Sequence, residues 1–384
     1  MTDNIQLCTT EKCTGCKACG DICPIKCITF KEDSEGFYTP DINRDVCIKC
    51  GRCMKTCPVI TPPTDTNTHN PKTYHAYSLN QQTVKSSSSG GIFVELAKSI
   101  ISQGGIVCGV TQIKGSLKSV NIAIDKFDDI QLLQGSKYVQ SDASNIYSTA
   151  IKALTNGQKV LFSGTPCQIA GMKNAVGKNK ENLFLVEVIC HGVPSYRFFK
   201  RYLNQVSNLS PSYFEFKNNA IWDYDTIMYD NRNRKHILIA KKDFYMKTFL
   251  NEEIFQNACY SCPFAKLPRQ ADITLGDYWG IENYEPHNSI NKSGNSVILI
   301  NNEKGMSLLN AIESACYISE VELKNVVKRN HNIYEPSKYK PQRATIYSDM
   351  DRLSLSDMAK KYNHRFTIRN YLGFLKRRIK EIFI

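Results

Sequence analysis

The chain has 384 residues, 42% of them hydrophobic, and Lys and Arg exceed Asp and Glu by 13. This length allows two or three domains, and no run approaches the roughly 18 consecutive apolar residues of a membrane-spanning helix. The positive charge is concentrated partly in the last 25 residues and no recognition motif accompanies it, so we expect no nucleic-acid partner. Residues 1–12 lack the apolar core of a secretory signal, which predicts a cytoplasmic protein.

Residues 1–62 carry one cysteine pattern twice, in the form C-x2-C-x2-C-x3-C-P. This is the ligand pattern of two-cluster bacterial ferredoxins, in which the fourth cysteine of each run binds the cluster of the other run. A disulfide scaffold would need a secretory context, and zinc would need two thiolate pairs, so both are disfavoured. We therefore assign one 4Fe-4S cluster to Cys13, Cys16, Cys19 and Cys57, and a second to Cys47, Cys50, Cys53 and Cys23.

Short β segments at 27–31 and 36–40 are expected to pack around these loops, which predicts an α+β, ferredoxin-like N-terminal domain. Residues 63–72 are rich in proline and polar residues and predict a linker. A second domain is expected over residues 73–340, and a basic amphipathic tail over 341–384.

The second domain begins with alternating strand and helix patterns. A strand at 72–79 is followed by a Ser- and Gly-rich loop at 86–91, a helix from 92 to 101 and a strand at 106–110. This order predicts an α/β domain with a mostly parallel sheet covered by helices. Residues 210–250 alternate aromatic and polar side chains, which predicts an inserted β region packed by its aromatics.

A further unit places two cysteines at the edge of this sheet. Strands at 159–163 and 183–189 flank a helix at 166–176, so Cys167 and Cys190 should follow neighbouring parallel strands. Ligands of open α/β sheets bind at that edge.

Cys259 and Cys262 form a late pair that could complete a site with Cys167 and Cys190. Spacing alone leaves zinc, a 4Fe-4S cluster and a reactive thiol pair open. Two upstream clusters need an acceptor for single electrons, and this favours iron. The other four cysteines are expected to be ordinary thiols: Cys8, Cys27, Cys108 and Cys316.

Six segments resemble the coenzyme F420 hydrogenase/dehydrogenase beta-subunit family, in family order. They are SGGIF at 89–93, GSKYV at 135–139, TPCQ at 165–168, CHGVP at 190–194, CYSCP at 259–263 and ADITLGD at 271–277. The resemblance implies FAD and one 4Fe-4S cluster in this domain, the cluster being held by Cys167, Cys190, Cys259 and Cys262. It also implies that six residues lie against FAD: Ser89, Gly90, Gly91, Ile92, Lys137 and Tyr138. We add Thr165 to this set.

These features together predict an oxidoreductase that passes electrons between 4Fe-4S clusters and FAD. Clusters carry one electron and hydride carriers two, so a flavin between them is expected. The two-electron partner would be coenzyme F420, NAD(P)H or a small organic molecule. No deazaflavin pocket is recognisable, and Asp277-Tyr278-Trp279-Gly280 and the basic tail look more like bacterial members found near surface-polysaccharide genes.

The alternative is a non-catalytic ferredoxin-type subunit that serves a larger redox complex. In either case we expect a redox partner protein or a small electron carrier. His191 is a weak candidate for a proton donor, and a hydrogen bond near the cluster is the favoured role. From residue 360 onward, apolar residues at helical spacing face Lys and Arg, which fits either contact with a membrane surface or packing on the protein itself.

Overall fold

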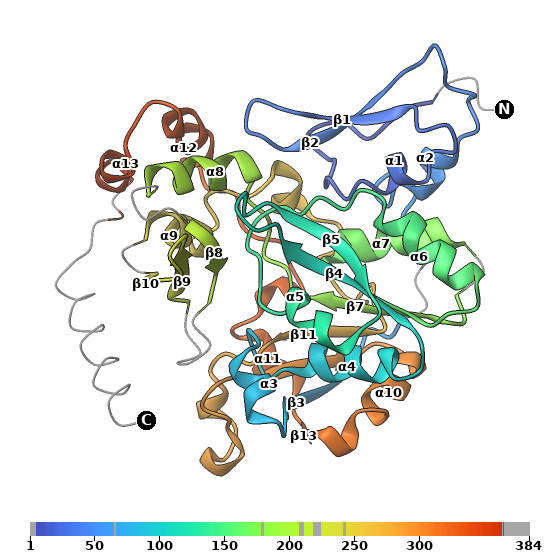
Figure 1. Ribbon diagram of the computed structural model, residues 1–384, viewed down its shortest axis with the longest axis vertical. Helices are drawn as coiled ribbons and strands as arrows, with labels where there is room; N and C mark the ends of the chain where they lie inside the picture. Colours follow the sequence, from blue (N-terminus) through green and yellow to red (C-terminus); the bar gives the residue numbers. More distant parts are fainter. Residues whose placement is uncertain are drawn as a thin grey trace.

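The computed structural model describes residues 5–64, 67–177, 180–206, 211–217, 224–240, 243–362 and 364. The N-terminal unit packs on one side of a large α/β body, and a smaller β region lies at another side (Figure 1). Among the described helices, none is long and apolar enough to cross a membrane.

The N-terminal unit combines two short helices with a hairpin. Its elements are α1 (Ala18–Asp21), β1 (Ile28–Glu32), β2 (Tyr38–Ile42) and α2 (Arg52–Thr56). Strands β1 and β2 pair antiparallel, with Phe30 opposite Pro40. Each short helix carries the third cysteine of its run, Cys19 in α1 and Cys53 in α2.

Within the described residues the body is built on an eight-stranded sheet of order β13-β3-β12-β11-β7-β6-β4-β5. The strands are β3 (Lys72–Ser78), β4 (Ile106–Gln112), β5 (Ser119–Ile124), β6 (Val160–Gly164), β7 (Leu183–Val188), β11 (Ile273–Asp277), β12 (Ser296–Ile300) and β13 (Cys316–Glu320).

The predicted parallel sheet is present at its centre but not at its edges. Strands β11, β7, β6 and β4 pair in parallel. Strands β5, β12 and β13 pair antiparallel with their neighbours. Strand β3 runs in the same direction as the four central strands. In the described sheet, however, it lies between β12 and β13 and is not next to β4. A turn joins β4 directly to β5, and such a short connection allows only antiparallel pairing.

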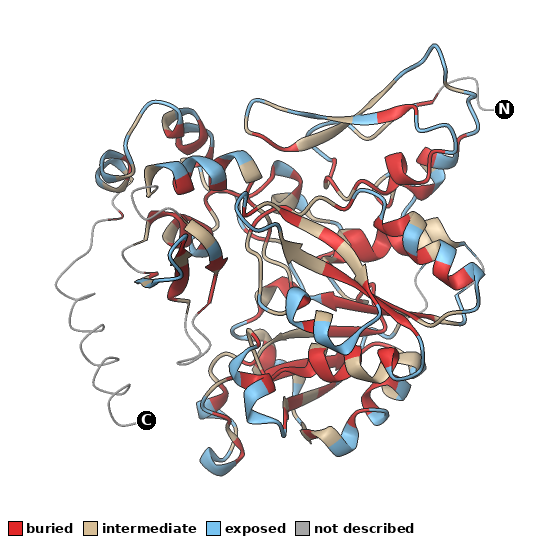
Figure 2. Ribbon diagram, in the orientation of Figure 1, coloured by how far each residue is buried: buried red, intermediate tan, exposed pale blue. Residues whose placement is uncertain are grey.

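Helices cover both faces of this sheet, which is buried along its centre (Figure 2). On one face α4 (Ile92–Ile101) and α10 (Glu303–Asn310) pack in a core that includes Val107, Leu161 and Val186. On the other face α6 (Ile146–Thr155) and α7 (Pro166–Val176) pack over Val160 and Phe162. Ala18 and Ile22, in and just after α1, belong to this second core, so the N-terminal unit packs directly on α6 and α7.

The predicted inserted β region is a separate three-stranded antiparallel sheet. It consists of β8 (Pro211–Glu215), β9 (Thr226–Asp230) and β10 (Lys235–Leu238), with the helices α8 (Tyr196–Gln205), α9 (Phe244–Leu250), α12 (Arg343–Met350) and α13 (Leu355–Lys361). Phe214 and Phe216 are buried in its aromatic core, as the alternation predicted.

The start of the expected tail belongs to the folded body. Ile346 of α12 and Met358 of α13 are buried in the same aromatic core, and α12 contacts both α8 and α13. The predicted amphipathic segment beyond residue 364 lies outside the described residues.

Candidate metal and cofactor centre

The first cavity of the N-terminal unit gathers cysteines from both runs. Cys13, Cys16 and Cys19 of the first run line it together with Cys57, the last cysteine of the second run. Its other walls include Leu7, Phe30, Pro40 and Val59. This is the crossed arrangement that the cysteine spacing predicts.

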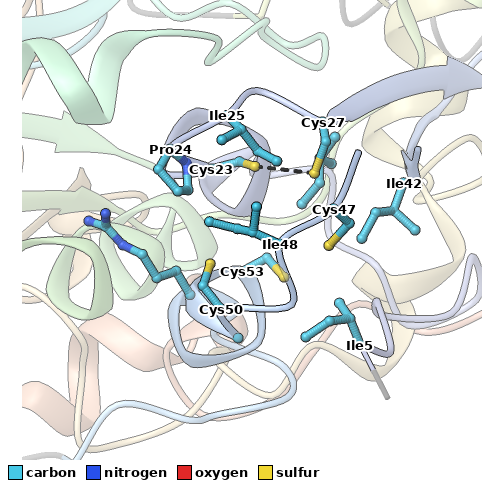
Figure 3. A pocket seen from close by; sticks show the side chains of 13 residues that line it. Ile5, Cys23, Pro24, Ile25, Cys27, Ile42, Cys47, Ile48, Cys50 and Cys53 are labelled. Atoms are coloured by element: carbon cyan, nitrogen blue, oxygen red, sulfur yellow. Dashed lines mark hydrogen bonds between the residues drawn. The ribbon is translucent and has the colours of Figure 1, made fainter. Parts of the chain in front are cut away.

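The second cavity has the complementary composition (Figure 3). Cys47, Cys50 and Cys53 line it together with Cys23 from the first run. Cys23 and Cys53 are buried, whereas Cys50 is exposed. The second cavity therefore opens toward solvent.

Each cavity also contains a fifth thiol that the cysteine spacing does not reveal. Cys8 lines the first cavity, and its hydrogen bond with Cys57 lowers the pKa of the Cys57 thiol to about 6. Cys27 lines the second cavity, with its Sγ 3.5 Å from Sγ of Cys23. Both fall outside the repeated spacing, which predicts ordinary thiols. The chain fold instead brings each beside the crossed cysteine of its cavity.

A third set of cysteines meets at the edge of the central sheet. Cys167 follows β6 at the start of α7, and Cys190 comes after β7. Cys259 lies in a 3₁₀ helix (Asn257–Ser261), and Cys262 directly follows it. Burial raises the pKa of Cys190, and the charges of Cys167 and Cys262 raise it further. Burial also raises the pKa of Cys259, and the charges of Cys190 and Cys262 raise it further. These mutual effects require the four thiols to lie close together.

The three sets adjoin one another in a fixed order. Burial raises the pKa of Cys19, and the charges on Cys13, Cys57 and Cys53 add to it, so the second cavity neighbours the first. Burial raises the pKa of Cys13 to about 11, with contributions from Cys57 and from Cys167 of the third set. The first cavity therefore lies between the other two sites.

Hydrogen bonds hold the first cavity against the third set. The side-chain amide of Gln256 donates to the carbonyl oxygen of Cys13 at 2.8 Å, and Gln140 donates to Gln256 at 3.0 Å. The Tyr147 hydroxyl of α6 donates to the carbonyl oxygen of Cys16 at 2.7 Å.

Ion pairs reinforce this junction from two sides. Asp142 lies 2.7 Å from Lys17 and 2.9 Å from Lys118, and these two cations hold the pKa of its carboxyl well below the usual range despite partial burial. Arg343 of α12 binds the carboxylate of Glu35 through both of its terminal nitrogens, at 2.8 and 2.5 Å. Such bidentate pairs fix geometry as well as charge.

The donor chemistry of all three sets fits iron–sulfur clusters. Each set offers four thiols, and thiolates are the ligands of these clusters. Among the described residues, no three His, Cys, Asp or Glu side chains converge tightly enough to hold a single ion. A cubane differs from a single ion because its iron atoms sit at separate corners and keep the four sulfur ligands apart.

The two loops that the resemblance assigns to FAD lie side by side. The backbone N–H of Ser136 donates to Oγ of Ser88 at 2.6 Å, and Gln134 donates to Oγ of Ser86 at 3.0 Å. These contacts join the 86–91 loop, which follows β3 and the short helix α3 (Gln81–Lys85), to the segment that carries Lys137. The residues predicted at 89–92 and at 137–138 thus belong to one region, although the two segments are distant in the chain.

The glycines of the first loop are required by the protein's own packing. A Cβ on Gly90 would lie 2.4 Å from the carbonyl oxygen of Ala76, and its N–H already donates to Oγ of Ser296 at 2.9 Å. Gly91 has φ +81°, a conformation that favours glycine, and it begins α4. The side chain of Ile92 packs in the core beneath, and Ser89 donates to the carbonyl oxygen of Asn295.

Lys137 lies in a setting suited to an anionic ligand. Its ammonium donates to the carbonyl oxygens of Leu133 and Gln134, at 3.3 and 2.6 Å. No carboxylate of the described residues pairs with it, and loss of hydration lowers its pKa to about 7. A phosphate beside it would supply the missing counter-charge. Tyr138, the next residue, stacks on Phe249 with ring centroids 4.6 Å apart.

A charged pair beside these loops has no signal in the local sequence. The buried Lys217, just after β8, lies 2.6 Å from Asp277 at the end of β11 and also donates to the carbonyl oxygen of Ser88. Its ammonium stands over the Trp279 ring, 4.6 Å from the centroid. Asp277 ends one of the family-like segments, but nothing in the chain's local pattern pairs it with Lys217.

The remaining predicted residues lie nearer the third cysteine set. Thr165 caps α7, and its hydroxyl is 3.1 Å from Sγ of Cys167. Its backbone N–H donates to Oε1 of Gln168 in α7 at 3.0 Å. Burial lowers the pKa of His191, as does the neighbouring His331, whose ring centroid is 6.2 Å away.

Two family models match this chain. Residues 12–60 match the 4Fe-4S dicluster domain, and residues 157–326 match the C terminus of the coenzyme F420 hydrogenase/dehydrogenase beta subunit. The chain therefore joins a region that matches the 4Fe-4S dicluster domain to a region that matches the C terminus of this beta-subunit family. All eight cysteines of the repeated pattern fall in the first match, and all four cysteines of the third set fall in the second.

Curated relatives of the two regions are similar over different spans. The F subunit of F420H2 dehydrogenase from Methanosarcina mazei is 22% identical over 47% of this chain and 53% of its own length. The coenzyme F420-dependent sulfite reductase of Methanocaldococcus jannaschii is 21% identical over 78% of this chain and 46% of its own. The chain thus spans about half the length of these relatives. The 7Fe ferredoxin of Hydrogenibacillus schlegelii is 46% identical over 13% of this chain and 60% of its own.

A chain of the F420-reducing [NiFe] hydrogenase complex from Methanosarcina barkeri has a comparable structure. It is 16% identical, with a TM-score of 0.49, over 78% of this chain and 95% of that chain.

Proposed function

We propose that this protein is an iron–sulfur flavoprotein oxidoreductase with three 4Fe-4S clusters in a row and FAD beside them. The observation that carries the proposal is the order of the cysteine sets, in which Cys53 neighbours Cys19 and Cys13 neighbours Cys167. Electron transfer weakens steeply with distance, so a series of adjoining clusters is useful as a conduit. The clusters would supply one-electron chemistry at these cysteines.

The residues between the sites hold the proposed conduit rigid. Gln140 and Gln256 fix the backbone of the first cavity, and Tyr147 holds Cys16 by its carbonyl oxygen. Buried hydrogen bonds of this kind keep a constant separation between the first and third sites, because breaking them leaves unpaired polar groups.

The region around Ser88, Lys137 and Tyr138 is the proposed FAD site. Lys137 would bind the negative charge of the cofactor, and Tyr138 would present an aromatic ring held in place by Phe249. FAD would supply the exchange between single electrons and a hydride. Lys217 and Asp277, at the border of this region, are placed to orient a polar substrate group.

The proposed two-electron partner is coenzyme F420, with NAD(P)H or a small organic molecule as the other members of the class. Two of the relatives carry F420 in their names, which supports this order of preference. The chain covers about half the length of these relatives, so their substrate is a proposal for this protein.

Anaerobic purification with iron, sulfide and flavin analysis tests the proposal. We expect about twelve irons and one FAD per chain. Lys137→Gln should lose most of the FAD and keep the iron, while Lys137→Arg should retain FAD because the positive charge remains. About eight irons and no flavin in the wild type would overturn the proposal.

A second candidate is a non-catalytic electron-transfer subunit, favoured by the exposure of Cys50 and by a relative that is itself a subunit. A subunit of this kind would be reduced by dithionite but would show no turnover with F420H2, NADH or NADPH. Turnover with any of these three would decide for the oxidoreductase.

A further inference from the structure

Exposed apolar side chains lie in the segments that form the second cavity. Ile25, Val46 and Ile48 have exposed fractions of 40%, 53% and 55%. Ile25 and Ile48 line the cavity with the exposed Cys50 (Figure 3). Exposed apolar groups gathered around a functional group are typical of an interaction site.

The segments that carry this site are basic. Segments 21–27 and 43–56 contain five basic residues, Lys26, Arg44, Lys49, Arg52 and Lys55, and two acidic residues, Asp21 and Asp45. Asp21 is buried and lies 3.4 Å from Lys26, the other six are exposed, and Arg52 also lines the cavity. An oxidised cluster with four thiolates adds about two negative charges, and the balance remains positive.

Both helices of the N-terminal unit contact the body. Helix α1 packs on α6 and α7, and α2 also contacts α7. Lys17 at the first cavity is paired with Asp142 of the body. The second cavity is the cysteine site farthest along the series from the third set, and it faces solvent.

We propose that Ile25, Val46 and Ile48, with Lys26, Arg52 and Lys55, form the docking site of an acidic one-electron carrier protein. The inference rests on the proposed function, and it adds the kind of partner. The apolar residues would exclude water over Cys50, and the basic residues would attract the carrier. One electron then passes from the reduced carrier to the oxidised cluster, with no bond made or broken.

Charge complementarity predicts how the association rate depends on salt and on the charge of the carrier. Oppositely charged surfaces accelerate association by about 10- to 1000-fold at low ionic strength, and salt screens this effect. Complexes of this type use small interfaces, so a few side chains can dominate. An acidic carrier should therefore react fastest at low salt, and a basic carrier should react slowly under the same conditions.

The experiment measures reduction of the anaerobic holoprotein in a stopped-flow instrument. The probe is a reduced acidic ferredoxin, tested at low and at high ionic strength. The variant is Arg52→Glu/Lys55→Glu, and the matched control is Lys85→Glu/Lys114→Glu, which changes the net charge equally at exposed positions of the body. We expect the variant to react with the ferredoxin about tenfold or more slowly at low salt. The control should stay close to the wild type.

A second variant, Lys55→Glu alone, keeps the test valid if the double variant fails to assemble its clusters. Equal rates for the variant and the control, or a rate with the ferredoxin that does not fall as salt is added, would overturn the docking site. Binding of DNA or of anionic vesicles at this surface, with no salt-dependent reaction with the ferredoxin, would overturn it as well. A wild type without a dithionite-reducible cluster signal would instead overturn the proposed function itself.

Discussion

The side-chain amide of Gln256 donates a 2.8 Å hydrogen bond to the backbone carbonyl oxygen of Cys13, across 243 positions of the chain. Gln256 lies three residues before Cys259, so this bond ties the loop of the first cavity to the third cysteine set. Gln140 supports it from the segment that follows the proposed FAD region. The relationship couples the N-terminal unit to the body at the point where the cysteine sets adjoin.

Gly15→Ala should weaken this junction. A Cβ at Gly15 would lie 2.4 Å from Nε2 of Gln140, and Gly15 has φ +66°. We expect the loss of about 2 to 4 kcal/mol of stability, from backbone strain and from displacement of Gln140. The measurement is the apparent thermal midpoint of the anaerobic holoprotein.

Gly115→Ala is the matched control for that variant. Gly115 has φ +85°, but a Cβ there would meet nothing within 4 Å. It should show only the backbone cost of about 1 to 2 kcal/mol. Equal losses for the two variants would mean that the contact with Gln140 contributes nothing.

Cys262→Ala should remove the cluster of the third set alone. We expect about four irons fewer per chain, with the spectrum of the two N-terminal clusters retained, because their cysteines lie in separate cavities. Iron analysis and electron paramagnetic resonance measure the change. Cys316→Ala, at a buried thiol in β13, should keep all of the iron. Unchanged iron in Cys262→Ala would exclude that residue as a ligand.

Cys27→Ala should lower the reduction potential of the second cluster. Burial and its contact with Cys23 raise the pKa of the Cys27 thiol to about 12, so Cys27 stays protonated and donates to the Cys23 sulfur. Hydrogen bonds to ligand sulfurs raise cluster potentials, and losing one should lower the potential by an amount on the order of tens of millivolts.

A potentiometric titration followed by electron paramagnetic resonance measures these shifts. Cys8→Ala should act in the same direction on the first cluster, because Cys8 shares a hydrogen bond with Cys57. Cys108→Ala, in the core of the sheet, should shift neither cluster. A shift of both clusters by either variant would contradict the assignment of one thiol to each cavity.

Asp243→Asn should change how stability depends on pH. Loss of hydration raises the pKa of Asp243 to about 6, while the Tyr202 hydroxyl donates to it at 2.5 Å. A carboxyl with a raised pKa stabilises the fold below its unfolded value of about 4, and this contribution disappears as pH rises through about 6. Wild type should lose on the order of 2 to 3 kcal/mol between about pH 4 and pH 7 at this residue.

The asparagine amide introduced by Asp243→Asn cannot ionise and can still cap α9, so the variant should lose less stability over that interval. Apparent unfolding midpoints at about pH 5, 6 and 7 measure the difference. Identical slopes for the variant and the wild type would show that Asp243 does not titrate in this range.

Local patterns of the sequence were sufficient to predict many elements. Helix α7 has the predicted bounds, and β6 and β7 pair in parallel as expected, so that Cys167 and Cys190 meet at one edge. The crossed grouping of Cys57 with the first run also follows from spacing. These features depend on residues close together in the chain, whose periodicity and turns are visible in the sequence.

Long-range packing decided the rest. The separation of β3 from β4, the placement of Cys8 and Cys27 inside the cavities, and the pair formed by Lys217 and Asp277 have no local pattern. The packing of the N-terminal unit on α6 and α7 also has no local pattern in the sequence, and this packing sets the order of the three cysteine sites. The sequence alone predicted the crossed grouping of the eight cysteines of the repeated pattern, because their ligand spacing is local. Only the tertiary structure determined how those sites line up, because that depends on buried contacts between segments far apart in the chain.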